Sequence, residues 1–372
     1  MAGIYVHIPF CSSSCVYCGF FSTTRLAERQ RYVDVVCREM DLRPLSEGRA
    51  DTVYVGGGTP SQLTPRQLEQ LFAYINNVYD VNPDAEVTIE CNPDDVTPSL
   101  AALLRRLPVN RVSMGVQTFD DARLQFLRRR HTSLQAREAV RLLRESGIAN
   151  ISIDLIYAFP GESLMQWHDD VHQALQLDVE HISAYALSYE EGTPLERMLR
   201  EGKVSEADEE LQRQMYYDLK DLLEAAGYEH YEISNFARLT SHGSFRSRHN
   251  SNYWNHTPYI GLGAGAHSFD GRRRQWNVAH LDQYIQAIGE GRVPAEGEEI
   301  DAVTYYNETV MTALRTCEGI DLSELTDGQR ESCIEQAQRY VEGGLLAIKG
   351  NRLCLTREGL FVSDMVMSDL ML

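Results

Sequence analysis

The chain has 372 residues with a formal net charge of −19, and 43% of its residues are hydrophobic. This composition is typical of a globular protein with one large core and a smaller module, and its acidity argues against nucleic acid as a partner, because clustered Lys and Arg bind phosphates. No apolar run approaches the roughly 20 residues of a membrane span, and no basic segment leads into an apolar one at the N-terminus, so we expect a cytoplasmic protein.

Six short, β-branched and largely apolar stretches alternate with amphipathic stretches in the first half of the chain. We predict buried strands at 3–8, 52–55, 86–90, 111–116, 151–156 and 181–186. Predicted helices lie between them at 26–42, 65–79, 98–106, 134–146 and 164–176. Because polar, chemically useful residues follow or end these strands, we expect an α/β fold in which six β/α units form an incomplete TIM-like barrel with its site at the C-terminal mouth.

The pattern changes in the second half. A helix at 205–226 and a strand at 229–233 lead into a loop-rich stretch, and helices are expected at 301–316, 321–325 and 329–342. A hairpin with its turn at Gly350 and Asn351 and a final helix complete a mainly helical, winged-helix-like outline. We therefore predict a barrel domain at 1–233, a connecting segment at 234–290 and a C-terminal module at 291–372.

The strongest chemical signal is the C-x-x-x-C-x-x-C motif of Cys11, Cys15 and Cys18, directly after the first predicted strand. Three thiolates from one loop can bind three irons of a 4Fe-4S cubane and leave the fourth iron open. The alternatives are a zinc site or buried cysteines. The remaining five cysteines are scattered and are predicted to be small core residues.

This motif resembles that of the radical S-adenosylmethionine (SAM) superfamily. The surrounding IYVHIPFC, YCGF and GGGTPS resemble its oxygen-independent coproporphyrinogen oxidase branch. The resemblance implies a barrel of the radical SAM type, an open iron that chelates SAM, and nine SAM-contacting residues: Tyr5, Tyr17, Gly57, Gly58, Thr59, Glu90, Gln117, Arg129 and Asp154. Tyr5 and Tyr17 could instead be ordinary packed aromatic residues. The polar residues of this set could instead make structural hydrogen bonds.

One residue separates the branches of this family. The oxidase has a fourth cysteine two positions after its third, and this chain has Phe20 there. The departure favours the sister group, the HemW-type heme chaperones, whose H-N-x-x-Y-W signature matches 249–254. The resemblance then implies heme as a further ligand, held near His249, Tyr253 and Trp254, since imidazole and phenolate can ligate heme iron and indole can stack on a porphyrin. The alternative is that these three residues are structural.

Three possibilities remain open at this point. The first is a heme chaperone that delivers heme to acceptor apoproteins, membrane-bound ones among them, and receives electrons from a flavodoxin or ferredoxin. It would cleave SAM without being a coproporphyrinogen dehydrogenase. The second is the oxidase reaction itself, the SAM-dependent oxidative decarboxylation of coproporphyrinogen III. A cluster-bearing scaffold without catalysis is a third, plainer possibility.

Overall fold

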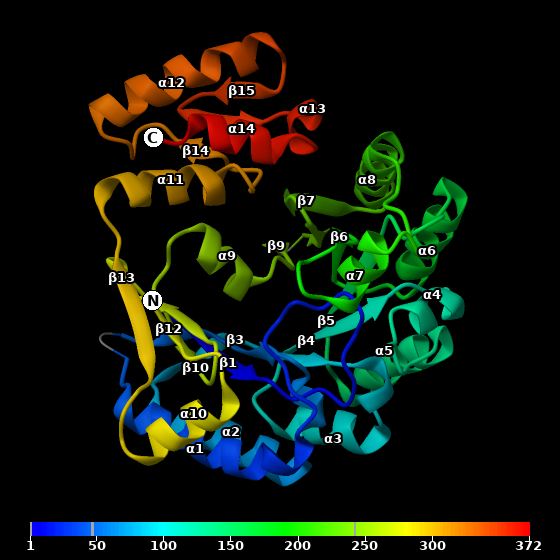
Figure 1. Cartoon of the computed structure of the whole chain (residues 1–372), viewed down its shortest axis with the longest axis vertical. Helices are drawn as coiled ribbons and strands as arrows, with labels where there is room; N and C mark the ends of the chain where they lie inside the picture. The colour runs from blue at the N-terminus through cyan, green and yellow to red at the C-terminus, as the bar shows by residue number, and fades with distance from the viewer. Residues whose placement is uncertain (1, 46–47, 242) are drawn as a thin grey trace.

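The computed structural model describes residues 2–45, 48–241 and 243–372. Six parallel strands follow one another in the sheet in chain order (Figure 1). They are β1 (Ala2–Ile8), β2 (Ala50–Gly57), β3 (Val81–Cys91), β4 (Arg111–Gln117), β5 (Asn150–Tyr157) and β6 (His181–Ala186). The predicted partial barrel is confirmed, with each strand within a few residues of its expected bounds.

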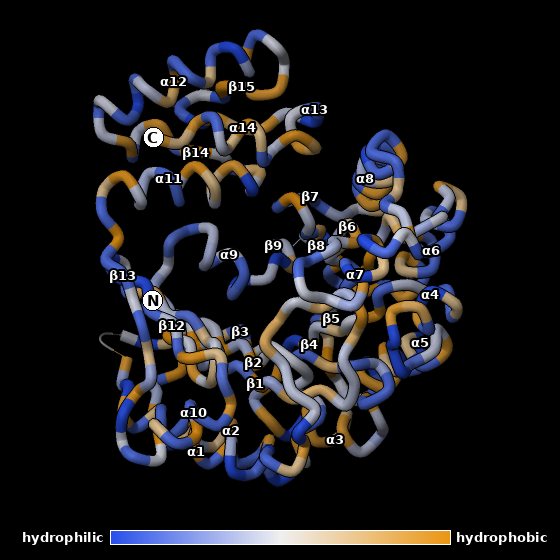
Figure 2. The backbone as a smooth tube through the Cα atoms, viewed as in Figure 1, coloured by the Kyte–Doolittle hydropathy of each residue, from blue (hydrophilic) through white to orange (hydrophobic). Residues whose placement is uncertain are grey.

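Side chains alternate along these strands between the two faces of the sheet. Val53, Val112 and Ile153 point outward and are buried in the main hydrophobic core. Their neighbours Tyr54, Arg111 and Asp154 line a cavity instead. The hydropathy colouring of Figure 2 shows hydrophobic and hydrophilic residues interspersed along the strands. The helices therefore pack on an apolar outer surface, whereas the interior of the barrel is polar.

The crossover helices begin at the caps that the sequence indicated. Thr64 forms a capping box with Gln67 before Pro65, and Gly147 ends a helix in the left-handed conformation with φ of 95°. The α-helices of the barrel are α1 (Arg29–Leu42), α2 (Pro65–Val78), α3 (Pro98–Arg106), α4 (Asp121–Phe126), α5 (Ser133–Ser146), α6 (Leu164–Gln176), α7 (Pro194–Arg200) and α8 (Glu209–Ala225). Short 3₁₀ turns lie at η1 (Leu26–Glu28), η2 (Pro60–Gln62) and η3 (Pro93–Asp95).

The segment that we expected only to connect two domains also extends the barrel sheet at both edges. β10 pairs in parallel with β1, and β8 pairs antiparallel with β6. The elements between β6 and the C-terminal module are β7 (Tyr228–Glu232), β8 (Asn235–Thr240), β9 (Gly243–Ser244), α9 (Arg248–Trp254), β10 (Tyr259–Leu262), β11 (His267–Phe269), β12 (Arg273–Asn277), α10 (Leu281–Gly289) and β13 (Ala295–Glu299). The predicted divisions at 233 and 290 stay predictions.

The C-terminal module has its own core and its own three-stranded sheet in the order β14-β16-β15. Its elements are α11 (Ala302–Ala313), β14 (Ile320–Asp321), α12 (Asp327–Glu342), β15 (Leu346–Lys349), β16 (Arg352–Leu355), α13 (Arg357–Leu360) and α14 (Ser363–Leu370). The helix expected at 321–325 is wrong, because Ile320 and Asp321 pair as a strand with Leu353 and Arg352. The predicted hairpin and final helix are confirmed.

Helix α9 occupies a distinctive position between these two parts. It contacts β2 of the barrel and α11 of the module, and Figure 1 shows it in the space between them. Within the described ranges no helix combines the length and the apolar character that crossing a bilayer requires.

Candidate functional site

A cavity of about 530 Å³ opens at the C-terminal ends of the parallel strands. Its walls are the loop between β1 and η1, which carries the three cysteines, together with the ends of β2 to β5. All twelve residues that the sequence assigned to the cluster and to SAM line this one cavity: Cys11, Cys15, Cys18, Tyr5, Tyr17, Gly57, Gly58, Thr59, Glu90, Gln117, Arg129 and Asp154. The structure thus brings them together, and their individual roles remain predictions.

The three cysteines of the loop are free thiols at the edge of the cavity. Cys11 Sγ lies 3.5 Å from Thr59 Oγ1, and Cys15 Sγ lies 3.7 Å from Nη1 of Arg129. Burial raises the pKa of the Cys11 and Cys18 thiols. Within the described ranges, no three His, Cys, Asp or Glu side chains converge on a single metal position. Three thiolates on one loop are the donors that a 4Fe-4S cubane with one open iron requires.

The glycine turn after β2 is packed directly against the end of β1. A Cβ on Gly57, whose φ is 112°, would lie 2.5 Å from the His7 ring. A Cβ on Gly58 would lie 2.7 Å from the carbonyl carbon of Pro9. Only residues without side chains fit here, and they leave backbone groups facing the cavity.

Two carboxyl groups enter the cavity from neighbouring strands. Glu90 accepts hydrogen bonds from Tyr54 Oη at 2.7 Å and from the Gly57 backbone N–H at 2.9 Å. Burial raises the pKa of Glu90 to about 7 and that of Asp154 to about 6. With these pKa values, both carboxyl groups are partly protonated near neutral pH. A bound cation or a hydroxyl group that donates to them would favour their ionised form.

Arg129 is fixed by a residue that the sequence reasoning missed. Its Nη2 donates to Asn92 Oδ1 at 2.7 Å and to the Gly115 carbonyl oxygen at 2.8 Å. Asn92 follows Glu90 by two positions in TIECNP and lines the same cavity. Its place at a strand end next to a predicted site residue was the signal that could have identified it.

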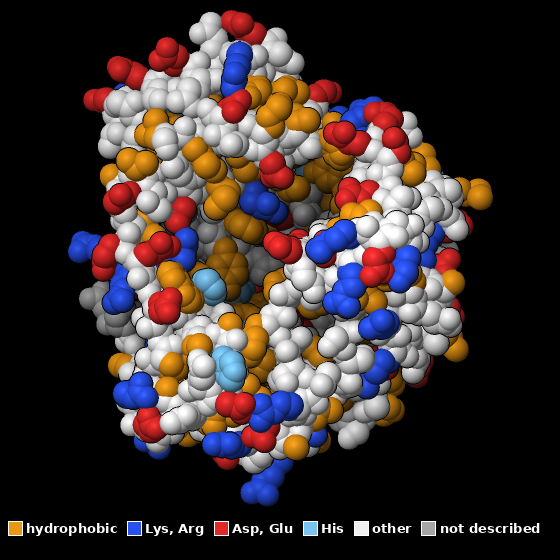
Figure 3. All heavy atoms as spheres, viewed as in Figure 1, with side chains coloured by type: hydrophobic (Ala, Val, Ile, Leu, Met, Phe, Trp, Pro, Cys, Tyr) orange, Lys and Arg blue, Asp and Glu red, His pale blue; other side chains and the backbone are white. Residues whose placement is uncertain are grey.

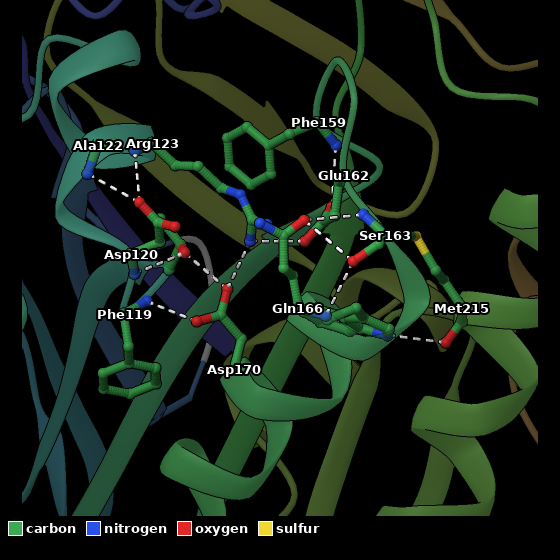
Figure 4. Close-up of polar contacts among 12 residues, drawn as sticks. Phe119, Asp120, Ala122, Arg123, Phe159, Glu162, Ser163, Gln166, Asp170 and Met215 are labelled. Atoms are coloured by element: carbon green, nitrogen blue, oxygen red, sulfur yellow. Dashed lines mark hydrogen bonds and ion pairs between the residues drawn. The ribbon is translucent and has the colours of Figure 1, made fainter.

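The last residue of β4, Gln117, has a φ of 69°. A buried polar network holds the turn that follows it (Figure 4). Asp170 on α6 accepts from Thr118 Oγ1 at 2.6 Å and from the Phe119 backbone N–H at 2.8 Å. Arg123 pairs with Glu162 at 2.8 Å and with Asp170 at 3.4 Å. These contacts fix the left-handed Gln117 position from the outer side of the barrel.

A second chamber of about 740 Å³ continues from this cavity into the barrel. The two spaces share Tyr17, Cys18, Glu90 and Asp154 among their walls. Phe20 also lines both spaces, and 76% of its surface is exposed. Hence a ligand in the chamber would lie directly beside whatever occupies the SAM cavity.

The three predicted heme residues on α9 do not share a cavity. His249 is 1% exposed, its Nδ1 lies 2.8 Å from Thr52 Oγ1, and its Nε2 lies 3.0 Å from Tyr253 Oη. Burial lowers the pKa of His249 to about 3. Trp254 instead lines a cavity of about 650 Å³ against the C-terminal module, with the Arg315 guanidinium 5.0 Å from its ring.

The incomplete parallel barrel, with three loop cysteines and a glycine turn at its mouth, defines a radical SAM protein. The model of the radical SAM superfamily matches residues 5–174, and that of the HemN C-terminal domain matches residues 300–362. Membership of this superfamily implies a 4Fe-4S cluster and SAM as cofactors. HemW proteins are 32% and 34% identical to this chain over nearly its whole length, so the chain belongs to the HemW family.

Relatives in this family match almost the whole chain. The heme chaperone HemW of Mycobacterium tuberculosis H37Rv is 34% identical over 376 residues, which cover 99% of this chain and 94% of that protein. The heme chaperone HemW of Bacillus subtilis 168 is 32% identical over 380 residues, which cover 98% of each. Among solved structures, the coproporphyrinogen III oxidase HemN of Escherichia coli superposes with a TM-score of 0.85 at 21% identity, covering 99% of this chain and 89% of that one. The similarity between this chain and HemN is a similarity of fold.

Proposed function

We propose that this chain is a heme chaperone: it binds a 4Fe-4S cluster, SAM and heme, and passes heme to acceptor apoproteins. The observation that carries the proposal is the chamber of about 740 Å³ that opens onto the SAM cavity within a chain related to HemW over its whole length. A volume of this size is in the range of small-molecule sites.

In this proposal Cys11, Cys15 and Cys18 hold the cluster, which supplies an electron to the SAM sulfonium when both are bound. Glu90 accepts from the methionine amino group, and the backbone of the glycine turn lies against the same end of SAM. Gln117, Arg129 and Asp154 contact its ribose and carboxylate. Asn92 positions Arg129 through the hydrogen bond of 2.7 Å.

Heme is proposed to enter the chamber past Phe20. His249 and Tyr253 stay its predicted ligands, and ligation through His249 Nε2 would require the Tyr253 hydroxyl to leave its present hydrogen bond of 3.0 Å. The acceptors include membrane-bound apoproteins, and the electron donor is a flavodoxin or ferredoxin. The protein is proposed to act in the cytoplasm.

Anaerobic reconstitution with iron and sulfide, followed by a hemin titration monitored by absorption spectroscopy, tests this function. We expect one heme per chain, and a double variant His249→Ala with Tyr253→Phe should bind it more weakly and with a changed Soret band. His168→Ala is the matched control, because His168 pairs with Asp218 at 2.7 Å on the outer helices. Unchanged heme affinity in the double variant would refute the ligand assignment.

The oxidase reaction is the second candidate, supported by the likeness in fold to HemN. Incubation with coproporphyrinogen III, SAM and a reductant distinguishes the two functions. Protoporphyrinogen at a catalytic rate would overturn the chaperone proposal. SAM cleavage that is lost in Cys15→Ala would exclude a purely structural cluster.

A further inference from the structure

Arg111 is a fully buried arginine with no hydrogen-bond or ion-pair partner among the described residues. It lies at the start of β4 and is 1% exposed. Its Nε makes no hydrogen bond, and no hydrogen bond or ion pair joins its guanidinium to any described residue. Among the described residues, Trp167 is the one fully buried side chain that is larger. The guanidinium is therefore neutralised by no direct contact with a described residue.

This guanidinium lines the chamber below the SAM cavity. Burial is the main cause of the shifted pKa values of Glu90, Asp154 and His249. The positive charge of Arg111 opposes the rise in the pKa of the two carboxyl groups and adds to the fall in that of His249, so all three lie within its electrostatic reach. Neither carboxylate neutralises it by contact. Glu90 is held by Tyr54 and Gly57, and both carboxylates are assigned above to SAM.

An unpaired buried charge lowers the stability of the folded state, and a guanidinium does not escape this cost by losing its proton. A ligand that brings an anion into the chamber removes the cost. The planar fork of arginine matches a carboxylate with two parallel hydrogen bonds. The unpartnered donor thus points to a carboxylate as the group that completes the site.

The other walls of the chamber indicate what carries this carboxylate. Ile156 and Leu187 are apolar and buried, and Tyr185 and Phe20 expose aromatic rings, 44% and 76% of their surfaces respectively. These walls come from the barrel and from Asn250 of α9. The space-filling view shows a further hollow between the barrel and the C-terminal module, with hydrophobic side chains inside it (Figure 3). A ligand with an apolar body and an anionic arm suits both features.

We propose that Arg111 binds a carboxylate of the molecule that occupies the chamber, and that it selects apolar, planar ligands with carboxylate arms. The identity of this ligand rests on the proposed function, under which the arm is a propionate of heme. Arg111 is then a specificity residue for heme, separate from the residues that ligate its iron.

Competition between hemin and hemin dimethyl ester tests this inference, because esterification removes both carboxylates and leaves the iron and the ring. The reconstituted protein should bind hemin about 10- to 100-fold more tightly than the ester, the range of one bidentate charged contact. Arg111→Met should abolish the preference, and Arg111→Lys should keep only part of it. Arg49→Met is the matched control, since Arg49 pairs with Asp80 on the surface.

The outcomes separate the inference from the function beneath it. Equal affinity of the unmodified protein for hemin and its ester would overturn the role of Arg111 and leave heme binding intact. Failure of the unmodified protein to bind hemin at all would overturn the proposed function. Thermal unfolding adds a second readout: removing an unpaired buried charge should leave the melting temperature of Arg111→Met unchanged or raised, and a marked fall would assign Arg111 a structural role.

Discussion

The affinity of the reconstituted protein for SAM should depend on pH through Glu90. Burial holds the pKa of this carboxyl near 7 instead of the ordinary 4.5. With that pKa, about a tenth of the Glu90 side chains are ionised at about pH 6 and about nine tenths at about pH 8. Only the ionised form attracts the cationic amino group of SAM. Because the α-amino group of SAM loses its own proton near pH 8, the dissociation constant should fall about fivefold between about pH 6 and 7 and change little up to about pH 8.

Isothermal titration of SAM into the anaerobically reconstituted protein measures this effect. In buffers of different ionisation enthalpy, binding at about pH 6 should release nearly one proton per SAM. Glu90→Gln should bind SAM about 10- to 100-fold more weakly at about pH 8, because a charged hydrogen bond is lost, and most of the pH dependence should vanish. Asp154→Asn should retain a pH dependence but move it to lower pH, because the Asp154 carboxylate raises the pKa of Glu90. An affinity that is flat from about pH 6 to 8 in the unmodified protein would refute the assignment of Glu90.

Three further predictions concern residues that support the site. Gly58→Ala should reduce iron incorporation, since its Cβ would lie 2.7 Å from the Pro9 carbonyl carbon, whereas Gly328→Ala, with open space around it, should leave iron content unchanged. Glu86 accepts two backbone N–H groups at the start of α9, at 3.0 and 2.9 Å. Glu86→Gln should therefore lower the free energy of unfolding measured in urea by about 1.5–3 kcal/mol and speed hydrogen exchange in α9. Hydrogen-exchange protection in α9 equal to that of the unmodified chain would contradict this. Burial raises the pKa of Glu162 from 4.5 to about 7, so the folded chain binds a proton on this carboxyl more tightly than the unfolded chain does. The free energy of unfolding should therefore decline as the pH rises through that interval. Urea titrations at several pH values measure this decline, which Glu162→Gln should lessen.

The barrel was predictable because its signals are local. Each strand is a short apolar run, and Thr64 and Gly147 mark helix ends through contacts within a few residues. The pairing of β10 with β1 was not predictable, since β10 has only four residues and its register depends on a strand far away in the chain. The error at 321–325 has the same origin: a distant strand, β16, overrides a weak local preference at Ile320 and Asp321.

Site residues divide in the same way. Motifs after strands placed the cysteines and the SAM residues in one cavity, because carboxyl ends of parallel strands always meet at one side. Arg111 belongs to no recognisable sequence motif. Only the alternation of side chains between the two faces of β4 indicates that it points into the barrel. The H-N-x-x-Y-W motif placed His249 and Trp254 close in sequence, yet the helix between them turns them toward opposite sides of α9.

Helix α9 has only seven residues, too few to be stable on its own. Its start is held by Glu86 of the barrel, and its end lies under Arg315 of the C-terminal module. Asn250 on this helix is part of the wall of the chamber. One wall of the chamber therefore depends on a helix that is held both by the barrel and by Arg315, and we expect a chain truncated before Arg315 to lose part of the support of that wall.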